Sequence, residues 1–267
     1  MNKETGHKHQ GKLESITRKW WFFLLFILLQ FVPPYASKGF EPAETGIVTG
    51  EILSNALVYD YPSLFPIFKI IPVLLVISII FLKNAVTRPF SVYVGITYVL
   101  FAFLQSIAVT ENYGLGIITI NAIMFSLVAA FWFWEAIIQK NDFTSQKQPK
   151  WKYWVVPLAF LAFWYPLTIS DGSMIPDFNP IGILTNMAGL AFCLMTPVYV
   201  GILTLYHPKI NIATLRVTSL VGVIIGIYNV LVNFILAFNT MWWNGVLHIP
   251  LLTISVYGLV LSFKKSS

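Results

Sequence analysis

Eight apolar stretches follow one another along this chain of 267 residues, separated by short polar loops. A transmembrane helix needs about 20 mostly apolar residues to cross the hydrocarbon core of a bilayer. Only 10% of the residues are charged, against about 25% in a typical soluble domain. We therefore predict an all-α membrane protein, a bundle of eight transmembrane helices. The predicted spans are residues 20–36, 63–82, 90–109, 114–139, 153–169, 181–206, 212–238 and 242–263.

The charges in the loops predict how these helices are oriented, because Lys and Arg are concentrated in cytoplasmic loops. The N-terminal tail, every second loop and the C-terminus are cationic, and the loops between them are acidic or neutral. Of the 17 Lys and Arg residues, only Lys38 and Lys69 fall on the outer side. We expect a multi-pass protein of the cell membrane with both termini cytoplasmic. Residues 1–19 form a polar tail, and residues 20–267 form one transmembrane domain.

The net charge of +6 would suggest nucleic acid as a partner if the protein were soluble. Here the cations flank apolar spans, as the positive-inside rule requires, so we expect the lipid bilayer as partner and no nucleic acid.

Residues 1–36 also resemble a cleavable signal peptide that ends near Ala36, which would leave seven spans. The likeness of spans one and five favours retention. At a constant offset, seven residues of the first span region match identical residues of the fifth; they are Lys19, Trp21, Leu25, Leu28, Pro33, Ser37 and Gly39. The match suggests a 4+4 duplication. Four spans per half give both halves the same orientation, so the repeats would be parallel.

The longest outer segment, residues 37–62, has two open interpretations. Its apolar residues alternate with acidic and small ones, which is compatible with a short amphipathic helix on the outer surface. A plain ordered loop fits the segment equally well.

Polar side chains inside the spans are costly and usually face the bundle interior. Measured at about 1.5 Å per residue from the outer helix ends, most of them lie in one layer, roughly 8–14 Å deep. Interhelical hydrogen bonding explains any single amide. Such bonding has no reason to avoid the cytoplasmic half, so the shared depth favours an outward-facing polar pocket. Its candidate binding residues are Lys69, Gln105, Glu111, Asn121, Asn186, Asn229, Asn233 and His248.

Within this layer, Lys69 needs a partner if its ammonium is buried, and Glu111 at the outer end of span three is the nearest acid in depth. Alternatively, Lys69 extends to the outer surface. His248 suits a pocket donor or a proton-linked group. No second histidine shares its depth, so no metal site is expected, and no cofactor motif is present.

These features favour a small-molecule transporter or binding protein, with four prolines as candidate helix breaks: Pro72, Pro157, Pro197 and Pro250. An intramembrane enzyme for a lipid-type substrate at the outer leaflet is an alternative, with Glu111, His248 and Lys69 as acid–base groups. A further alternative is a non-catalytic subunit of a membrane complex. The partner would then be another subunit, or a second copy of the chain in a homo-oligomer. Of these functions we favour a transporter over an enzyme, and we assign no catalytic residue.

Overall fold

A computed structural model describes residues 3–144 and 149–264 of the chain. It is all-α, with 74% of residues helical. The chain divides into two compact units, Met1–Pro62 with Arg88–Ile138, and Ser63–Thr87 with Gln139–Ser267. The α-helices are α1 (Lys3–Thr17), α2 (Trp20–Leu29), α3 (Thr45–Ser54), α4 (Phe65–Leu82), α5 (Thr87–Leu100), α6 (Thr119–Ile138), α7 (Val155–Trp164), α8 (Gly182–Thr185), α9 (Phe192–Tyr206), α10 (Ile212–Leu231) and α11 (Phe238–Leu261).

Shorter elements connect these helices. Two π-helical turns, η5 (Phe101–Gln105) and η8 (Val232–Leu236), extend α5 and α10. The 3₁₀ turns are η1 (Pro42–Glu44), η2 (Leu57–Asp60), η3 (Pro62–Leu64), η4 (Lys83–Val86), η6 (Lys150–Trp154) and η7 (Met187–Leu190). The strands are β1 (Tyr35–Ala36), β2 (Ile107–Thr110), β3 (Gly114–Ile117), β4 (Leu167–Ser170) and β5 (Ser173–Pro176).

Four helical segments of the described residues are long and apolar enough to cross a membrane: Pro62–Gln105, Thr119–Ile138, Ile212–Leu236 and Phe238–Leu261. A fifth arises if the bent pair Gly182–Leu190 and Phe192–Tyr206 counts as one span. The first segment has 44 residues, about 66 Å as a straight helix, which is twice the roughly 30 Å of a bilayer core. Lys83 interrupts it with a φ of 52°.

The first and fifth predicted spans each contain only a short helix. Helices α2 and α7 have 10 residues each, about 15 Å, which is half of a bilayer core. Both give way to extended chain, β1 after α2 and β4 after α7. Length alone therefore does not make either helix a membrane span.

In the first unit, a small sheet of strand order β1-β3-β2 packs against α3. Val48 and Ile52 of α3 are fully buried against Ala108 of β2 and against Ile118. The apolar spacing of the 37–62 segment thus produces a helix over Thr45–Ser54, which settles that open alternative in favour of the helix.

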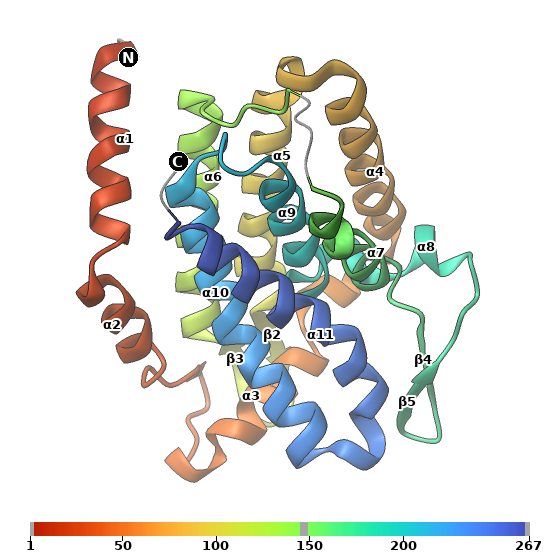
Figure 1. The fold of residues 1–267 in the computed structure, drawn as a ribbon. Helices are drawn as coiled ribbons and strands as arrows, with labels where there is room; N and C mark the ends of the chain where they lie inside the picture. The colour runs from red at the N-terminus through yellow and green to blue at the C-terminus, as the bar shows by residue number, and fades with distance from the viewer. Residues whose placement is uncertain (1–2, 145–148, 265–267) are drawn as a thin grey trace. The chain divides into compact units, whose positions relative to one another are not determined.

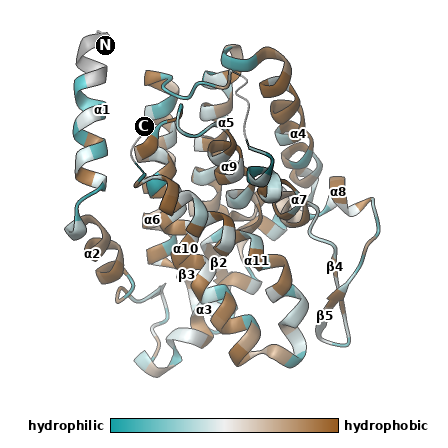
Figure 2. Cartoon of the chain, viewed as in Figure 1, coloured by the Kyte–Doolittle hydropathy of each residue, from teal (hydrophilic) through white to brown (hydrophobic). Residues whose placement is uncertain are grey.

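The N-terminal segment of the first unit also contacts α6. Gln10 of α1 accepts a hydrogen bond of 2.7 Å from the Trp134 indole, and Gln30 after α2 lies 3.7 Å from the Met124 sulfur. Figure 2 shows α1 as largely hydrophilic or neutral and α2 as hydrophobic, so the change from polar tail to apolar segment falls between them.

In the second unit, α10 and α11 run side by side (Figure 1) and pack through small residues. A Cβ on Gly222 would collide with the Ser255 hydroxyl, and a Cβ on Gly258 would collide with the Ser219 hydroxyl. The serine of each helix therefore occupies the space over the glycine of the other. This reciprocal fit lets two backbones approach closely without a large apolar side chain between them.

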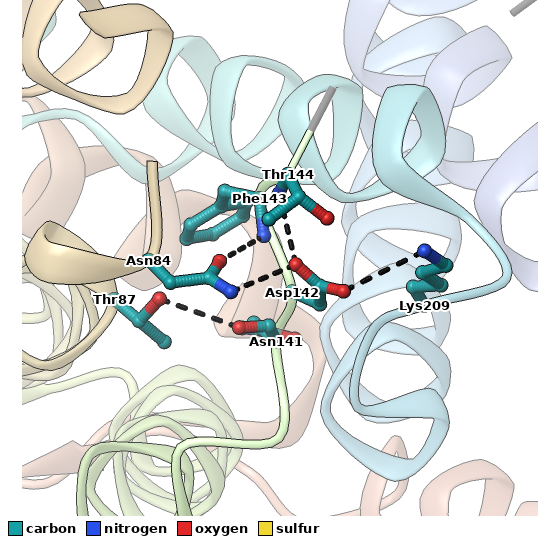
Figure 3. A network of polar contacts seen from close by, with 7 residues as sticks. All are labelled: Asn84, Thr87, Asn141, Asp142, Phe143, Thr144 and Lys209. Carbon is teal, nitrogen blue, oxygen red and sulfur yellow. Dashed lines mark hydrogen bonds and ion pairs between the residues drawn. The ribbon is translucent and has the colours of Figure 1, made fainter. Parts of the chain in front are cut away.

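Three loops of the second unit are joined by a polar network around Asp142 (Figure 3). The carboxylate accepts hydrogen bonds from the Asn84 amide at 2.8 Å and from the Thr144 N–H at 2.9 Å. It also lies 3.7 Å from the Lys209 ammonium. Asn141 continues the network, because its side-chain oxygen accepts from the Asn211 N–H at 2.7 Å.

Removing the charge of Asp142 should destabilise the protein in a pH-dependent way. The hydrogen bonds from Thr144, then that from Asn84 and the charge of Lys209, lower the pKa of Asp142 to about 2. A depressed carboxyl pKa stabilises the fold above the unfolded value of about 3.9, and this contribution is lost as the pH falls toward 2. D142N should therefore lower Tm at pH 7, and its gap to wild type should shrink between about pH 4 and pH 2.

Asp60 is an exposed acid that supplies the matched control. D60N removes the same charge, and its Tm should stay near that of wild type. A D142N deficit that is the same at pH 7 and at pH 3 would contradict the role of the carboxylate charge.

Candidate functional site

The candidate site of the second unit is built around the end of α7. This helix stops at Trp164, where Tyr165 adopts a left-handed conformation with a φ of 52°. The last carbonyls of a helix have no partner within the helix and need donors from elsewhere. Lys69 of α4 supplies one, because its Nζ donates to the Phe163 carbonyl and lies 4.1 Å from the centroid of the Phe163 ring.

Asn186 supplies the next donor. Its amide nitrogen donates to the carbonyls of Trp164 at 2.6 Å and of Tyr165 at 3.2 Å. The Trp243 indole then donates to the Pro166 carbonyl at 2.7 Å. Three side chains from distant parts of the sequence thus cap one helix end.

Asn186 also lies where the next apolar segment bends. Gly182–Leu190 and Phe192–Tyr206 meet at an angle of 94°. The side chain of Asn186 accepts from the Ala188 N–H at 3.1 Å and so caps η7. Gly189 of η7 faces the Phe68 main chain so closely that any Cβ would collide with the Phe68 carbonyl.

A chain of amide hydrogen bonds starts from Tyr165. The Tyr165 hydroxyl donates to the Asn244 side chain at 2.9 Å, and the Asn244 amide donates to the Asn233 side chain at 2.8 Å. The Asn233 amide continues to the Asn229 carbonyl at 2.7 Å. The Asn229 amide lies 3.5 Å from the Cys193 sulfur. We call Tyr165, Asn244, Asn233 and Asn229 the amide chain.

His248 adjoins the amide chain. Its Nδ1 is 2.7 Å from the Asn244 carbonyl. Because a carbonyl only accepts, Nδ1 carries the proton, and neutral His248 presents Nε2 as an acceptor. The His248 ring also meets Tyr165 edge to face, with centroids 6.4 Å apart.

The structure therefore places five of the eight candidate residues in the second unit: Lys69, Asn186, Asn229, Asn233 and His248. Lys69, Asn233 and His248 are buried, and Asn186 and Asn229 are half-buried. Asn186 and Lys69 meet at the end of α7, and the other three lie on or beside the amide chain. All five serve at least in part as hydrogen-bonding partners within the fold.

The other three candidates belong to the first unit. Gln105 is half-buried and ends the π-helical turn η5, and Asn121 is half-buried in the first turn of α6. Glu111 is exposed between β2 and β3, and its main-chain carbonyl accepts from Lys38 Nζ. The pairing of Glu111 with Lys69 stays a prediction, and the partners that the structure gives Lys69 are a carbonyl and a ring.

The four prolines are not where the helices break. Pro72, Pro197 and Pro250 lie inside continuous helices, and Pro157 lies in the first turn of α7. The prediction of proline breaks was wrong because a membrane helix tolerates a proline when local adjustments and neighbours satisfy the freed carbonyl. The backbone irregularities fall elsewhere: α7 ends at Tyr165, the next apolar segment bends at residues 186–191, and α10 ends in the π-helical turn η8.

Tyr165, Trp243 and Asn244 were missing from the predicted site. A signal for Tyr165 was present, because Pro166 disfavours helix at the preceding residue and so marks the end of α7. Among the described residues, no group of three or more His, Cys, Asp or Glu side chains is placed to hold a metal ion.

Comparisons with protein-family models, with curated proteins and with solved structures found no match for this chain.

Removing Asn244 should destabilise the protein more than removing the Tyr165 hydroxyl. Y165F deletes one hydrogen bond and should cost about 1 kcal/mol. N244A leaves both the Tyr165 hydroxyl and the Asn233 oxygen without this partner, and a buried unsatisfied group costs roughly 1–3 kcal/mol.

The free energy of unfolding in a detergent titration measures both effects. The double variant should lose less than the sum of the single variants, because residues in direct contact are coupled. Strict additivity would contradict the Tyr165–Asn244 bond.

Proposed function

We propose that this protein is a polytopic membrane protein that binds and carries a small polar solute, with its site at the outer part of the second unit. One observation carries the proposal. The end of α7 at Tyr165, the bend at residues 186–191 and the end of α10 at η8 are joined to one another by polar side chains.

Interrupted helices are unusual inside a membrane. Non-helical backbone is tolerated at membrane depth only where protein buries it or where it lines a water-filled cavity. Transporters place substrate sites at such discontinuous helices, since the free helix ends offer hydrogen bonds and partial charges. The π-helical turn η8 fits this pattern, because π-turns are frequent at functional sites.

The donors of the site suggest the class of solute. Lys69 and Asn186 now donate to the carbonyls at the end of α7. A carboxylate or another oxygen-rich group would offer the same donors a stronger acceptor. His248 Nε2 would complement it by accepting from a hydroxyl or amine of the solute. We therefore favour a small solute that carries a carboxylate.

The proposal includes eight crossings with both termini cytoplasmic. The contacts within each unit support it, because loops predicted on the same side meet. In the second unit, the network of Asp142 joins three loops that are all predicted to be cytoplasmic. In the first, α3 and the β2–β3 turn, both predicted to lie outside, pack together with β1, which is at the outer end of the first predicted span.

The short helix α7 fits a crossing when its neighbours are considered. Lys152, just before it, lies 3.4 Å from the His207 carbonyl, in a loop predicted to be cytoplasmic. Tyr165, at its other end, bonds to Asn244, which is predicted to lie near the outer surface. Strand β4 adds four residues at about 3.3 Å each, so helix and strand together extend nearly 30 Å.

Paired local features support the 4+4 repeat. Both α2 and α7 have 10 residues, and Gly39 and Gly172 follow them with φ values of 74° and 73°. The turns η5 and η8 are both π-helical and each ends a long helix. The halves differ at the next step, because β2 and β3 follow η5 whereas α11 follows η8 directly.

The function is tested with protein reconstituted in vesicles and a panel of labelled small carboxylates. K69M and N186A should each reduce uptake or binding of the solute that wild type takes by about tenfold or more, since each removes a hydrogen bond to a charged group worth about 1.5–3 kcal/mol. T185A is a matched control, because Thr185 is the exposed neighbour of Asn186. Unchanged uptake in folded K69M and N186A would contradict the site.

The topology is tested separately by labelling single cysteines in a C193S background, because Cys193 is the only cysteine of the chain. A membrane-impermeant maleimide added to intact cells should label N112C and S173C, which are predicted to lie outside. It should label T144C only after the membrane is permeabilised. Labelling of T144C in intact cells would contradict the predicted orientation.

A further inference from the structure

A second binding feature lies on the second unit, away from the amide chain. An apolar groove of about 260 Å³ runs between α4, α7 and α9. An apolar cavity of roughly 150 Å³ is enough to hold a benzene molecule, so this groove has room for a larger hydrocarbon group. Its walls include Pro72, Val76, Val155, Phe160, Gly201 and Leu205.

Basic groups gather at one end of the same groove. Val155 lines the groove and follows η6, which contains Lys152; Leu205 lines it and is followed two residues later by His207. Lys152 Nζ lies 3.4 Å from the His207 carbonyl, which ties these two chain segments together at this end.

A further cation, Lys264, acts on both Lys152 and His207. Burial and then the charge of Lys264 lower the pKa of Lys152. Burial and then the charges of Lys152 and Lys264 lower the pKa of His207. His207 is 7% exposed, and its Nε2 is buried without a hydrogen-bond partner. Lys152 and Lys264 repel each other, so both would gain from an anion near them.

Aromatic side chains beside these groups match a membrane interface. Trp151 and Tyr153 of η6 are exposed, and Trp151 and Trp154 pack edge to face on Tyr257. Trp and Tyr concentrate where lipid headgroups meet the hydrocarbon region. The basic end of the groove thus lies at headgroup level, on the side predicted to be cytoplasmic.

We propose that this groove is a binding site for an anionic phospholipid, with the headgroup phosphate at Lys152 and Lys264, beside His207, and one acyl chain between α4, α7 and α9. Basic pockets between helices on the cytoplasmic side recognise anionic lipid headgroups in this manner. The basic end of this site is separate from the solute site, although Phe163, whose ring contacts Lys69, also lines the groove.

The test is native mass spectrometry of the purified full chain in detergent, titrated with dioleoylphosphatidylglycerol or with dioleoylphosphatidylcholine. Wild type should retain the anionic lipid preferentially. K152Q should weaken its retention about fivefold, the effect of losing one cation near the headgroup. K152R should retain it, and K150Q is the matched control, because Lys150 is exposed in the same turn.

The groove itself is tested through Gly201. A Cβ at this position would make only an ordinary contact, 3.8 Å from the Ala159 Cβ. G201A should therefore leave lipid retention unchanged, whereas G201L should fill the groove and weaken retention of both lipids.

Two results would overturn the proposal. Equal weakening by K150Q and K152Q would indicate attraction to a diffuse positive surface. If millimolar inorganic phosphate abolished the preferential retention of the anionic lipid and G201L had no effect on retention, the site would be one for a free anion. Loss of lipid preference in K152Q with solute uptake intact would support the lipid site and leave the proposed function unaffected.

Discussion

The architecture of the second unit depends on how the end of α7 is satisfied. A helix that stops within apolar surroundings leaves carbonyls that cost free energy unless donors reach them. Lys69, Asn186 and Trp243 each reach one carbonyl or more between Phe163 and Pro166. These donors come from α4, from the bend before α9 and from α11, so one helix end holds three other segments in place.

This requirement has a consequence for the backbone around it. Helix α4, which carries Lys69, also lies close to η7, and there Gly189 faces the Phe68 carbonyl with no room for a Cβ. The same logic applies at α10 and α11, where Gly222 and Gly258 each leave space for a serine hydroxyl of the other helix. Small residues thus appear where polar contacts need close backbones, and large apolar residues fill the remaining surface.

Much of this could be predicted from the sequence, since a bilayer penalises unpaired polar groups. Asn233 and His248 were expected to face inward, and both are buried. The hydrogen-bond partners of the polar residues could not be predicted. Lys69, for example, donates to a main-chain carbonyl, and because every residue has one, the sequence does not indicate which carbonyl is the acceptor. The helix breaks were also misassigned, because a proline is visible in the sequence whereas the donors that rescue it are not. Helix α3 was one of two open alternatives, since its apolar spacing fits a helix and a loop.

The dual use of the site residues bears on the proposed function. Lys69 and Asn186 cap α7 in the structure, so a carboxylate that binds them must compete with the carbonyls of Phe163 and Trp164. Solute binding and the integrity of the end of α7 would then be linked, and by linkage any change that loosens this end would favour the solute-bound state. Tyr165 would transmit the change, because it both ends α7 and begins the amide chain. If Lys69 and Asn186 only capped α7, no solute would compete for their hydrogen bonds. The effect of K69M on uptake, compared with its effect on stability, therefore separates a role in solute binding from a role in capping the helix.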